Sequence, residues 1–437
     1  MSAPKLRVAI CGGGIGGLCL AVALSKYTHI QVDVYESAGR FREIGAGVMI
    51  WERTWHILEL LGLATDFARV ADGVQDPSAG TQRQSAIRRT TYCILTRSIY
   101  TDGLVRFHRS DFLDVFVDHV PEGVAHFGKR LLSYEKRDGG ELGLKFEDGT
   151  SAVCDLLVGC DGIKSVVRGQ MLRAKAQELG RPDLLALIEP KWTGSIAYRG
   201  LIPATELPTA DGAKHRTLTS PMMHIVAYSV SRGKTINIVA FASELDKDNT
   251  PYSSEWVTDC TKDEMLQCFA GWEPEVTMLL EGVDKPTKWG IHHLHPLPFF
   301  VADRVALLGD AAHGMSPHLG AGSGQAIEVT VAEFIGHNNE PIQDAYVLAS
   351  ILGSGAATTA TLDAALAAYQ QTRLRVANRA LENSYEAGKM FEFNSSFGDE
   401  YSTLGPAMGR QWAFLTESTP EGETEKAMGI FWSLQGQ

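Results

Sequence analysis

The sequence of 437 residues predicts an α/β fold with a doubly wound domain that is discontinuous in the chain, an inserted antiparallel sheet and C-terminal helices. Three observations predict this fold. An apolar strand at residues 6–11 runs through a glycine turn into an apolar helix. From about residue 192 to 243 apolar residues recur with a period of two, which is typical of antiparallel strands. Near residue 303 a buried-strand pattern returns, and from 325 onward the chain is mostly helical with a polar C-terminal tail.

The glycine turn has the spacing G-x-G-x-x-G, formed by Gly12, Gly14 and Gly17. The first glycine makes the tight turn, the second lets a pyrophosphate approach the backbone, and the third allows close packing of helix and strand. The N-terminus of the helix offers N–H groups to the diphosphate. A second strand, at residues 31–35, is followed by Glu36, whose carboxylate can accept from both hydroxyls of an adenosine ribose. Because a carboxylate disfavours a 2′-phosphate, the pattern predicts a Rossmann-type site for FAD or NAD, not NADP.

Composition limits the partners of this chain. It is 44% hydrophobic and 21% charged, which is typical of a globular enzyme, and its net charge of −12 argues against broad binding of nucleic acid or anionic membranes. No apolar run predicts a transmembrane segment, and the first residues lack a signal-peptide pattern. The seven cysteines, without a C-x-x-C pair, indicate reduced thiols in a cytoplasmic protein and no metal site.

Three segments together resemble the FAD-dependent aromatic hydroxylases of the 4-hydroxybenzoate hydroxylase type, and most closely the salicylate hydroxylases of fungi and bacteria. They are the glycine turn, Asp161-Gly162, and the run 309–313 with Pro317. The similarity extends to about residue 393 and includes the runs 108–112, 127–130, 197–200 and 269–272. The sequence departs from the family pattern at Val329, where the family has an acid, and this puts a local hydrogen bond there in doubt.

The resemblance and the changes of pattern together divide the chain into four parts. We expect the FAD-binding domain at 1–185 and 291–335, a substrate-binding β-sheet domain at 186–290, and a helical region at 336–437. Strands of the inserted sheet are expected at 195–202, 224–231 and 235–241, and a polar surface excursion at 72–91. No second G-x-G-x-x-G is present, so NADH or NADPH is expected only as a transient co-substrate.

Further cofactor contacts are expected on loops far apart in sequence. Asp310 follows a buried strand and can bond a ribityl hydroxyl of FAD, although it could also be a helix N-cap. A small-residue helix start suits the N1–C2=O edge of the isoalloxazine. It comprises Gly320, Ala321, Gly322 and Ser323. The resemblance implies that Arg109 contacts the phosphate or ribityl part and that Gly47 and Val48 lie beside the flavin; a surface position is the alternative for Arg109.

Substrate contacts are expected on the inserted sheet. Members of this family hydroxylate through a flavin C4a-hydroperoxide that attacks a carbon activated by an ionised phenol. Arg199 shares a strand face with apolar residues, and Tyr228 lies on another strand; they match the Arg/Tyr pair with which dearomatising hydroxylases orient a phenolate. His318 matches a histidine near the substrate in salicylate hydroxylases and is a candidate general base. The alternative for Arg199 and Tyr228 is a structural role in the core.

The sequence therefore predicts an FAD-dependent, NAD(P)H-consuming monooxygenase that hydroxylates a phenolic substrate, with decarboxylative hydroxylation of a hydroxybenzoate favoured. One alternative is dearomatising hydroxylation of a substituted phenol in secondary metabolism. Another, of a different class, is a catalytically silent flavin-binding redox scaffold. The ring substituents, the choice between NADH and NADPH and the oligomeric state stay open at this point.

Overall fold

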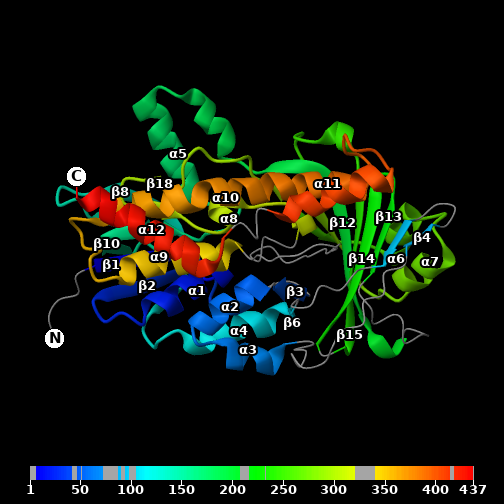
Figure 1. The fold of residues 1–437 in the computed structure, drawn as a ribbon, viewed down its shortest axis with the longest axis horizontal. Helices are drawn as coiled ribbons and strands as arrows, with labels where there is room; N and C mark the ends of the chain where they lie inside the picture. The colour runs from blue at the N-terminus through cyan, green and yellow to red at the C-terminus, as the bar shows by residue number, and fades with distance from the viewer. Residues whose placement is uncertain are drawn as a thin grey trace.

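The computed structural model describes residues 6–41, 47–50, 52–71, 87–89, 94–97, 105–206, 216–231, 233–319, 340–413 and 418–436. A parallel sheet lies at one end of the molecule and a larger antiparallel sheet at the other (Figure 1). Helix α10 (Leu362–Phe391) runs along both, and its 30 residues make it about 45 Å long. The predicted α/β fold is confirmed.

The first sheet has six strands in the order β18-β19-β11-β1-β2-β7. Their bounds are β1 (Leu6–Cys11), β2 (Ile30–Glu36), β7 (Ala125–Phe127), β11 (Leu156–Gly159), β18 (Val301–Ala302) and β19 (Val305–Leu307). All neighbours are parallel except β18 and β19. The predicted buried strand near residue 303 is confirmed as β19, which pairs in parallel with β11 and so belongs to the same sheet as β1. As a result, the carboxyl ends of β2, β1, β11 and β19 lie along one edge of the sheet.

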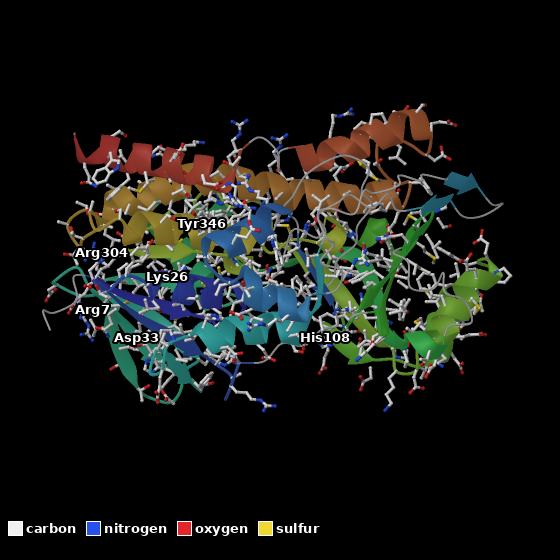
Figure 2. All side chains as sticks on the ribbon, turned by 60° about the horizontal axis from the view of Figure 1, so that its bottom comes forward. Arg7, Lys26, Asp33, His108, Arg304 and Tyr346 are labelled. Atoms are coloured by element: carbon white, nitrogen blue, oxygen red, sulfur yellow. The ribbon has the colours of Figure 1, made fainter. Side chains whose placement is uncertain are left out.

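Shorter elements surround this sheet. Helices α1 (Ile15–Leu24) and α9 (Glu340–Gly353) pack together beside it, and a two-stranded ribbon extends toward the other sheet. The remaining elements of this part are β3 (Gly47–Ile50), α2 (Glu52–Leu60), α3 (Ala64–Val70), β6 (Val105–His108), α4 (Arg109–His119), β8 (Leu131–Lys136), β9 (Leu142–Phe146), β10 (Ser151–Cys154), α5 (Val166–Leu179) and α8 (Asp310–His313). In Figure 2, Arg7 lies at the far end of the molecule, whereas His108, at the end of the ribbon strand β6, lies toward the antiparallel sheet.

The second sheet has eight antiparallel strands in the order β16-β17-β12-β15-β14-β13-β5-β4. Their bounds are β4 (Ile87–Arg89), β5 (Ile94–Arg97), β12 (Lys191–Pro203), β13 (Arg216–Ser220), β14 (Met223–Val230), β15 (Thr235–Ser243), β16 (Val257–Asp259) and β17 (Thr287–His293). The three predicted strands are confirmed as β12, β14 and β15. Strands β4 and β5 were not predicted, because three or four residues are too few to show apolar alternation. Strand β4, at the edge of the sheet, falls within the segment 72–91 that was expected to be a surface excursion. The four-part division of the chain stays a proposal.

Successive side chains of each strand point to opposite sides, so this sheet has two different faces. One face packs on helices α6 (Lys262–Cys268) and α7 (Pro274–Glu281) through residues such as Ile225, Ile238 and Ala240. The opposite face carries Val226, Val239 and Phe241 and packs against α10 and the loop after α8. Residues at alternate positions of β12, β14, β15 and β17 therefore face the first domain.

The polar C-terminal tail forms two helices, α11 (Tyr401–Ala413) and α12 (Pro420–Gln435). Helix α12 packs on α9, α10 and α2, and it buries Ala427 and Phe431 in the core of the first domain. These helices confirm the expected helical C-terminus, and α12 is polar in composition because only a narrow stripe of the helix is buried. No helix in the described part of the chain is both long and apolar enough to cross a membrane.

If α12 is part of the core, Phe431→Ala should lower the free energy of unfolding by about 3–5 kcal/mol, because it leaves a cavity. The neighbouring Trp432 is 51% exposed, so Trp432→Ala is the matched control and should change it by less than about 1 kcal/mol. Urea denaturation followed by circular dichroism measures both. Equally small losses would show that the helix contributes little to the core.

Candidate functional site

The glycine turn between β1 and α1 forms a cradle that side chains would fill. Gly12 has φ of +110°, and a Cβ there would lie 2.1 Å from the carbonyl oxygen of Cys160. A Cβ on Gly17, in the first turn of α1, would lie 2.1 Å from the carbonyl oxygen of Gly12. Gly14 is the N-cap residue of α1 and no side chain caps that helix end. The open turn and uncapped N–H groups fit the diphosphate of a dinucleotide.

Two carboxylates lie on the same edge of the parallel sheet. At the end of β2, Glu36 accepts the N–H groups of Gly13 and Ala38, each at 2.7 Å. Asp310 follows β19 as the first residue of α8 and is buried. Strands β2 and β19 are three strand spacings apart, about 14 Å. Dinucleotides bind across the carboxyl ends of such strands, so Glu36 would hold the adenosine end of FAD and Asp310 the ribityl end.

The turn that carries Asp310 is clamped from two sides. Arg168 of α5 donates a hydrogen bond from Nη1 to the carbonyl oxygen of Ala311 at 2.9 Å. On the other side, Oδ2 of Asp344 in α9 lies 2.6 Å from Nε2 of His313 and accepts the N–H of Gly309 at 3.4 Å. The backbone on both sides of Asp310 is therefore fixed by residues from two different helices.

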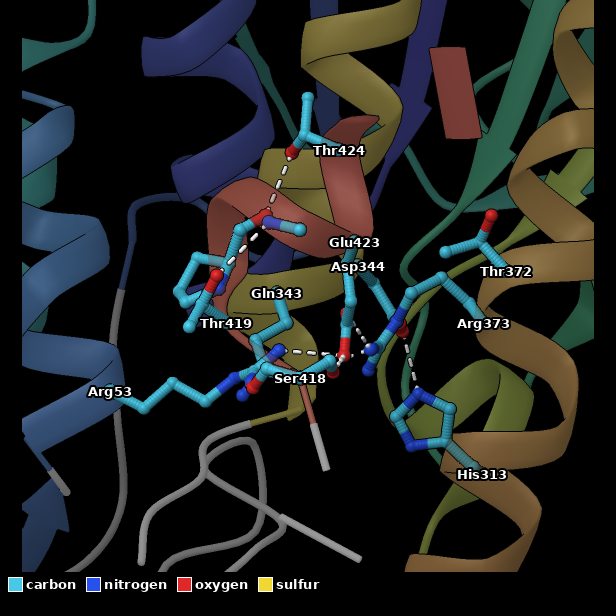
Figure 3. Close-up of polar contacts among 12 residues, drawn as sticks. Arg53, His313, Gln343, Asp344, Thr372, Arg373, Ser418, Thr419, Glu423 and Thr424 are labelled. Carbon is cyan, nitrogen blue, oxygen red and sulfur yellow. Dashed lines mark hydrogen bonds and ion pairs between the residues drawn. The ribbon is translucent and has the colours of Figure 1, made fainter. Parts of the chain in front are cut away.

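Asp344 belongs to a buried network of acidic and basic side chains (Figure 3). Its Oδ1 accepts from Nε of Arg373 at 2.8 Å, and Nη1 of Arg373 donates to Glu423 at 2.6 Å. The other oxygen of Glu423 lies 2.6 Å from Nη2 of Arg53. Burial alone would raise the pKa of Glu423, but Arg373 and Arg53 lower it overall, so the carboxylate stays ionised near neutral pH. We name Arg53, Asp344, Arg373 and Glu423 the buried ion network; its formal charges cancel.

The ribbon of β3 and β6 brings the first domain to the antiparallel sheet. Gly47 in β3 is paired with His108 in β6, and the next residue, Arg109, begins α4 and is buried. Val48 is buried as well. A Cβ on Gly47 would lie only 2.7 Å from the hydroxyl oxygen of Tyr228, so a side chain larger than hydrogen would separate the ribbon from the sheet.

The three predicted substrate residues lie on one face of the antiparallel sheet or against it. Arg199, 5% exposed, is on β12, and its Cζ lies 4.5 Å from the ring centre of Trp289 on β17. Tyr228, on β14, is completely buried and faces the same side. His318 precedes the described end of the loop after α8, with its ring 5.1 Å from that of Phe241 on the same face.

The environment of His318 favours the neutral imidazole. Burial lowers its pKa well below the ordinary value, and His224 and His293 lower it further. The ring is 4% exposed, lies 5.2 Å from the ring of His224 and packs on Gly388 of α10. A neutral imidazole can accept a proton from a phenol. His318 therefore has the protonation state that a general base requires, although its lowered pKa also weakens its basicity.

Four predicted cofactor residues, Gly320, Ala321, Gly322 and Ser323, lie outside the described residues.

Sequence reasoning missed several residues that the structure brings to the site or to the buried ion network. Asn237 stands at an inward-facing position of a predicted strand, where alternation calls for an apolar residue, and this signal could have found it. Asp344 interrupts an apolar helix, which was a weaker signal. Nothing in the sequence marks Arg373 and Glu423 as buried, because charged residues on helices usually face solvent.

Comparison with known proteins agrees with this geometry. A family model described as FAD binding domain matches residues 5–180. The chain is 36% identical to a salicylate hydroxylase of Pseudomonas putida, over 97% of this chain and 94% of that protein. It is 32% identical to the 6-methylsalicylate 1-monooxygenase of Aspergillus terreus, over 90% and 85% of the two chains. A solved structure described as a salicylate hydroxylase substrate complex superposes with a TM-score of 0.79 at 30% identity, covering 98% of both chains.

The link from the buried ion network to the Asp310 turn can be tested on cofactor retention. Asp344→Asn should raise the dissociation constant of FAD roughly tenfold to a hundredfold, because a charged hydrogen bond that positions the turn is lost. Flavin fluorescence on dilution measures it. Asp363→Asn, at an exposed position at the start of α10, should bind FAD like the unmodified protein. Equal FAD affinity in the two variants would contradict the link.

Proposed function

The chain belongs to the family of FAD-dependent monooxygenases that includes the salicylate hydroxylases, and from this we propose that it hydroxylates a hydroxybenzoate with loss of its carboxyl group as CO₂. FAD is the cofactor, and NADH or NADPH is its typical co-substrate in this family. The observation that carries the proposal is that Arg199 and Tyr228 lie on one sheet face, that His318 packs against this face, and that Tyr228 lies beside Gly47. An aromatic hydroxylase requires an anion site, a hydrogen-bonding group and a base close together.

Each of these three residues has a different role toward the substrate. Arg199 binds the anionic group of the substrate, since a guanidinium in an apolar setting with one side on Trp289 favours a carboxylate or phenolate partner. Tyr228 hydrogen-bonds the ring substituent that faces the ribbon. His318, neutral near pH 7, takes the phenol proton and so makes the ring carbon nucleophilic.

FAD, when bound, supplies an electrophilic oxygen atom from O₂ at the expense of NAD(P)H. The sheet face supplies an apolar surround for that transfer through Val226, Val239 and Phe241, which limits access of water. Addition of the oxygen to the carboxylated carbon gives a non-aromatic adduct. Its C–C bond to the carboxylate breaks, the electron pair returns to the ring, and CO₂ leaves. The nicotinamide is oxidised, and the second oxygen atom becomes water.

A second candidate is dearomatising hydroxylation of a substituted phenol, in which the attacked carbon carries an alkyl group and the product is a dienone. The pair of Arg199 and Tyr228 favours this reaction as much as the first, because either residue can bind a phenolate.

We further propose that the protein works in the cytoplasm. Its described cysteines support this, because all are free thiols, which is typical of a reducing compartment.

Release of labelled CO₂ decides between the two reactions. Holoenzyme supplied with NADH or NADPH and carboxyl-labelled hydroxybenzoates should release label in proportion to nicotinamide oxidised. A product in which a hydroxyl group replaces the carboxyl group is expected in equal amount by mass spectrometry. If no hydroxybenzoate releases label while a carboxyl-free phenol yields a dienone, the dearomatising reaction replaces the first proposal.

The roles of Arg199 and Tyr228 predict uncoupling when either is changed. Arg199→Ala and Tyr228→Phe should lower hydroxylation by a factor on the order of 10²–10⁴ with FAD still bound, because the phenolate is no longer stabilised. Nicotinamide oxidation should then yield hydrogen peroxide. Tyr198→Phe is the matched control, since Tyr198 is next to Arg199 on β12 but faces α6. If nicotinamide oxidation stays coupled to hydroxylation in all three variants, Arg199 and Tyr228 have only a structural role.

A further inference from the structure

One side chain on the same sheet face has no partner to explain it. Asn237 of β15 is completely buried. Neither its amide oxygen nor its amide nitrogen has a hydrogen-bond partner in the part of the chain that the structure describes. Other inward positions of β15 are apolar, including Val239 and Phe241. A polar residue with both groups unsatisfied thus stands where the strand otherwise places hydrocarbon.

The register of the sheet puts Asn237 at the centre of the substrate residues. It is paired directly with Tyr228 on β14 and with Leu201 on β12. Paired side chains project from the same face with Cβ atoms about 4.5–5.5 Å apart. Arg199 is paired with Val239, so it is the diagonal neighbour of Asn237 on β12. The amide therefore lies between the guanidinium on one side and the phenol ring on the other.

Leaving this amide unsatisfied is costly. A buried amide without a partner destabilises the folded state by about 1–3 kcal/mol, whereas leucine is similar in size and would bury hydrocarbon there. The unsatisfied group is explained if a ligand completes its hydrogen bonds. Asn237 shares a face with Arg199 and Tyr228, the residues proposed above to bind the substrate.

We propose that Asn237 binds a second, un-ionised hydroxyl on the substrate ring and so selects a dihydroxybenzoate over a monohydroxybenzoate. This inference rests on the proposed function. The amide offers one acceptor and two donor hydrogens. A carboxylate and a phenolate only accept hydrogen bonds, so neither satisfies both ends of the amide. A neutral hydroxyl both donates and accepts, and the anionic group of the same ring remains for Arg199.

The test combines one variant with a series of substrates. Asn237→Leu removes the hydrogen bonds at nearly constant volume. The substrates are monohydroxybenzoate with the hydroxyl ortho to the carboxylate, and the dihydroxybenzoates that keep this ortho hydroxyl. The unmodified holoenzyme should prefer one of the dihydroxybenzoates. In Asn237→Leu, the ratio of kcat/KM for that compound to kcat/KM for monohydroxybenzoate should fall roughly tenfold to a hundredfold, mainly through KM for the dihydroxybenzoate.

Ile238→Val is the matched control, because Ile238 is adjacent on β15 but faces α6 and α7. It should change no substrate preference. The melting temperature of Asn237→Leu should be equal to or above that of the unmodified protein. A loss shared equally by all substrates, or no preference in the unmodified enzyme, overturns the assignment. If the leucine variant does not fold, the same ratio of kcat/KM between dihydroxybenzoate and monohydroxybenzoate is measured in Asn237→Ala.

Binding separates this inference from the proposed function. Ligand dissociation constants are measured from the change in flavin absorbance, without nicotinamide and therefore without turnover. If the unmodified enzyme releases no CO₂ but still binds the dihydroxybenzoate more tightly, with that preference lost in Asn237→Leu, the reaction is wrong and the role of Asn237 stands. If it releases CO₂ and the variant keeps the same preference, the reaction stands and the role of Asn237 is overturned.

Discussion

The buried ion network is the interaction on which the arrangement of the first domain depends. It joins α2, α9, α10 and α12, and through Asp344 it reaches His313 and the turn that carries Asp310. Such a network contributes little net stability compared with hydrocarbon of the same volume. Leaving any one charge unpartnered, however, costs about 3–5 kcal/mol. These helices can therefore pack only in an arrangement that closes the network, and that arrangement also fixes the turn that carries Asp310.

A second constraint is the period of two in the antiparallel sheet. Because side chains alternate, one face of β12, β14 and β15 packs on two helices while the other is left to face the first domain. The residue that neighbours Arg199 along β12, Tyr198, therefore contributes to a different core. Arg199, Tyr228 and Asn237, which we propose bind the substrate, stand among valine and phenylalanine, where a hydrogen bond or ion pair would not be weakened by water. Alternation thus supplies both the position of these residues and the apolar setting that makes them effective.

Features that depend on a few neighbouring residues could be predicted from the sequence. The turn at Gly12, the acid Glu36 at the end of the second strand and the inward position of Arg199 each follow from local spacing. Features that depend on contacts between distant segments could not. Glu423 is an ordinary helix charge in the sequence, and only the fold brings it to Arg373 and Arg53. The short strands β4 and β5 exist because β13 offers an edge to pair with, which no local pattern reveals. Asn237 is an intermediate case, since its inward position could be predicted but its missing partners could not.

The contact between Gly47 and Tyr228 connects the two halves of the site. Glycine at position 47 lets the ribbon strand β3 approach the phenol ring within van der Waals distance, and the same ring is paired with Asn237 across the sheet. Tyr228 therefore touches the strand expected beside the flavin and also lies among the residues proposed to bind substrate. This contact requires both the glycine at position 47 and the register of β14, which places Tyr228 on the face of the sheet that meets the ribbon.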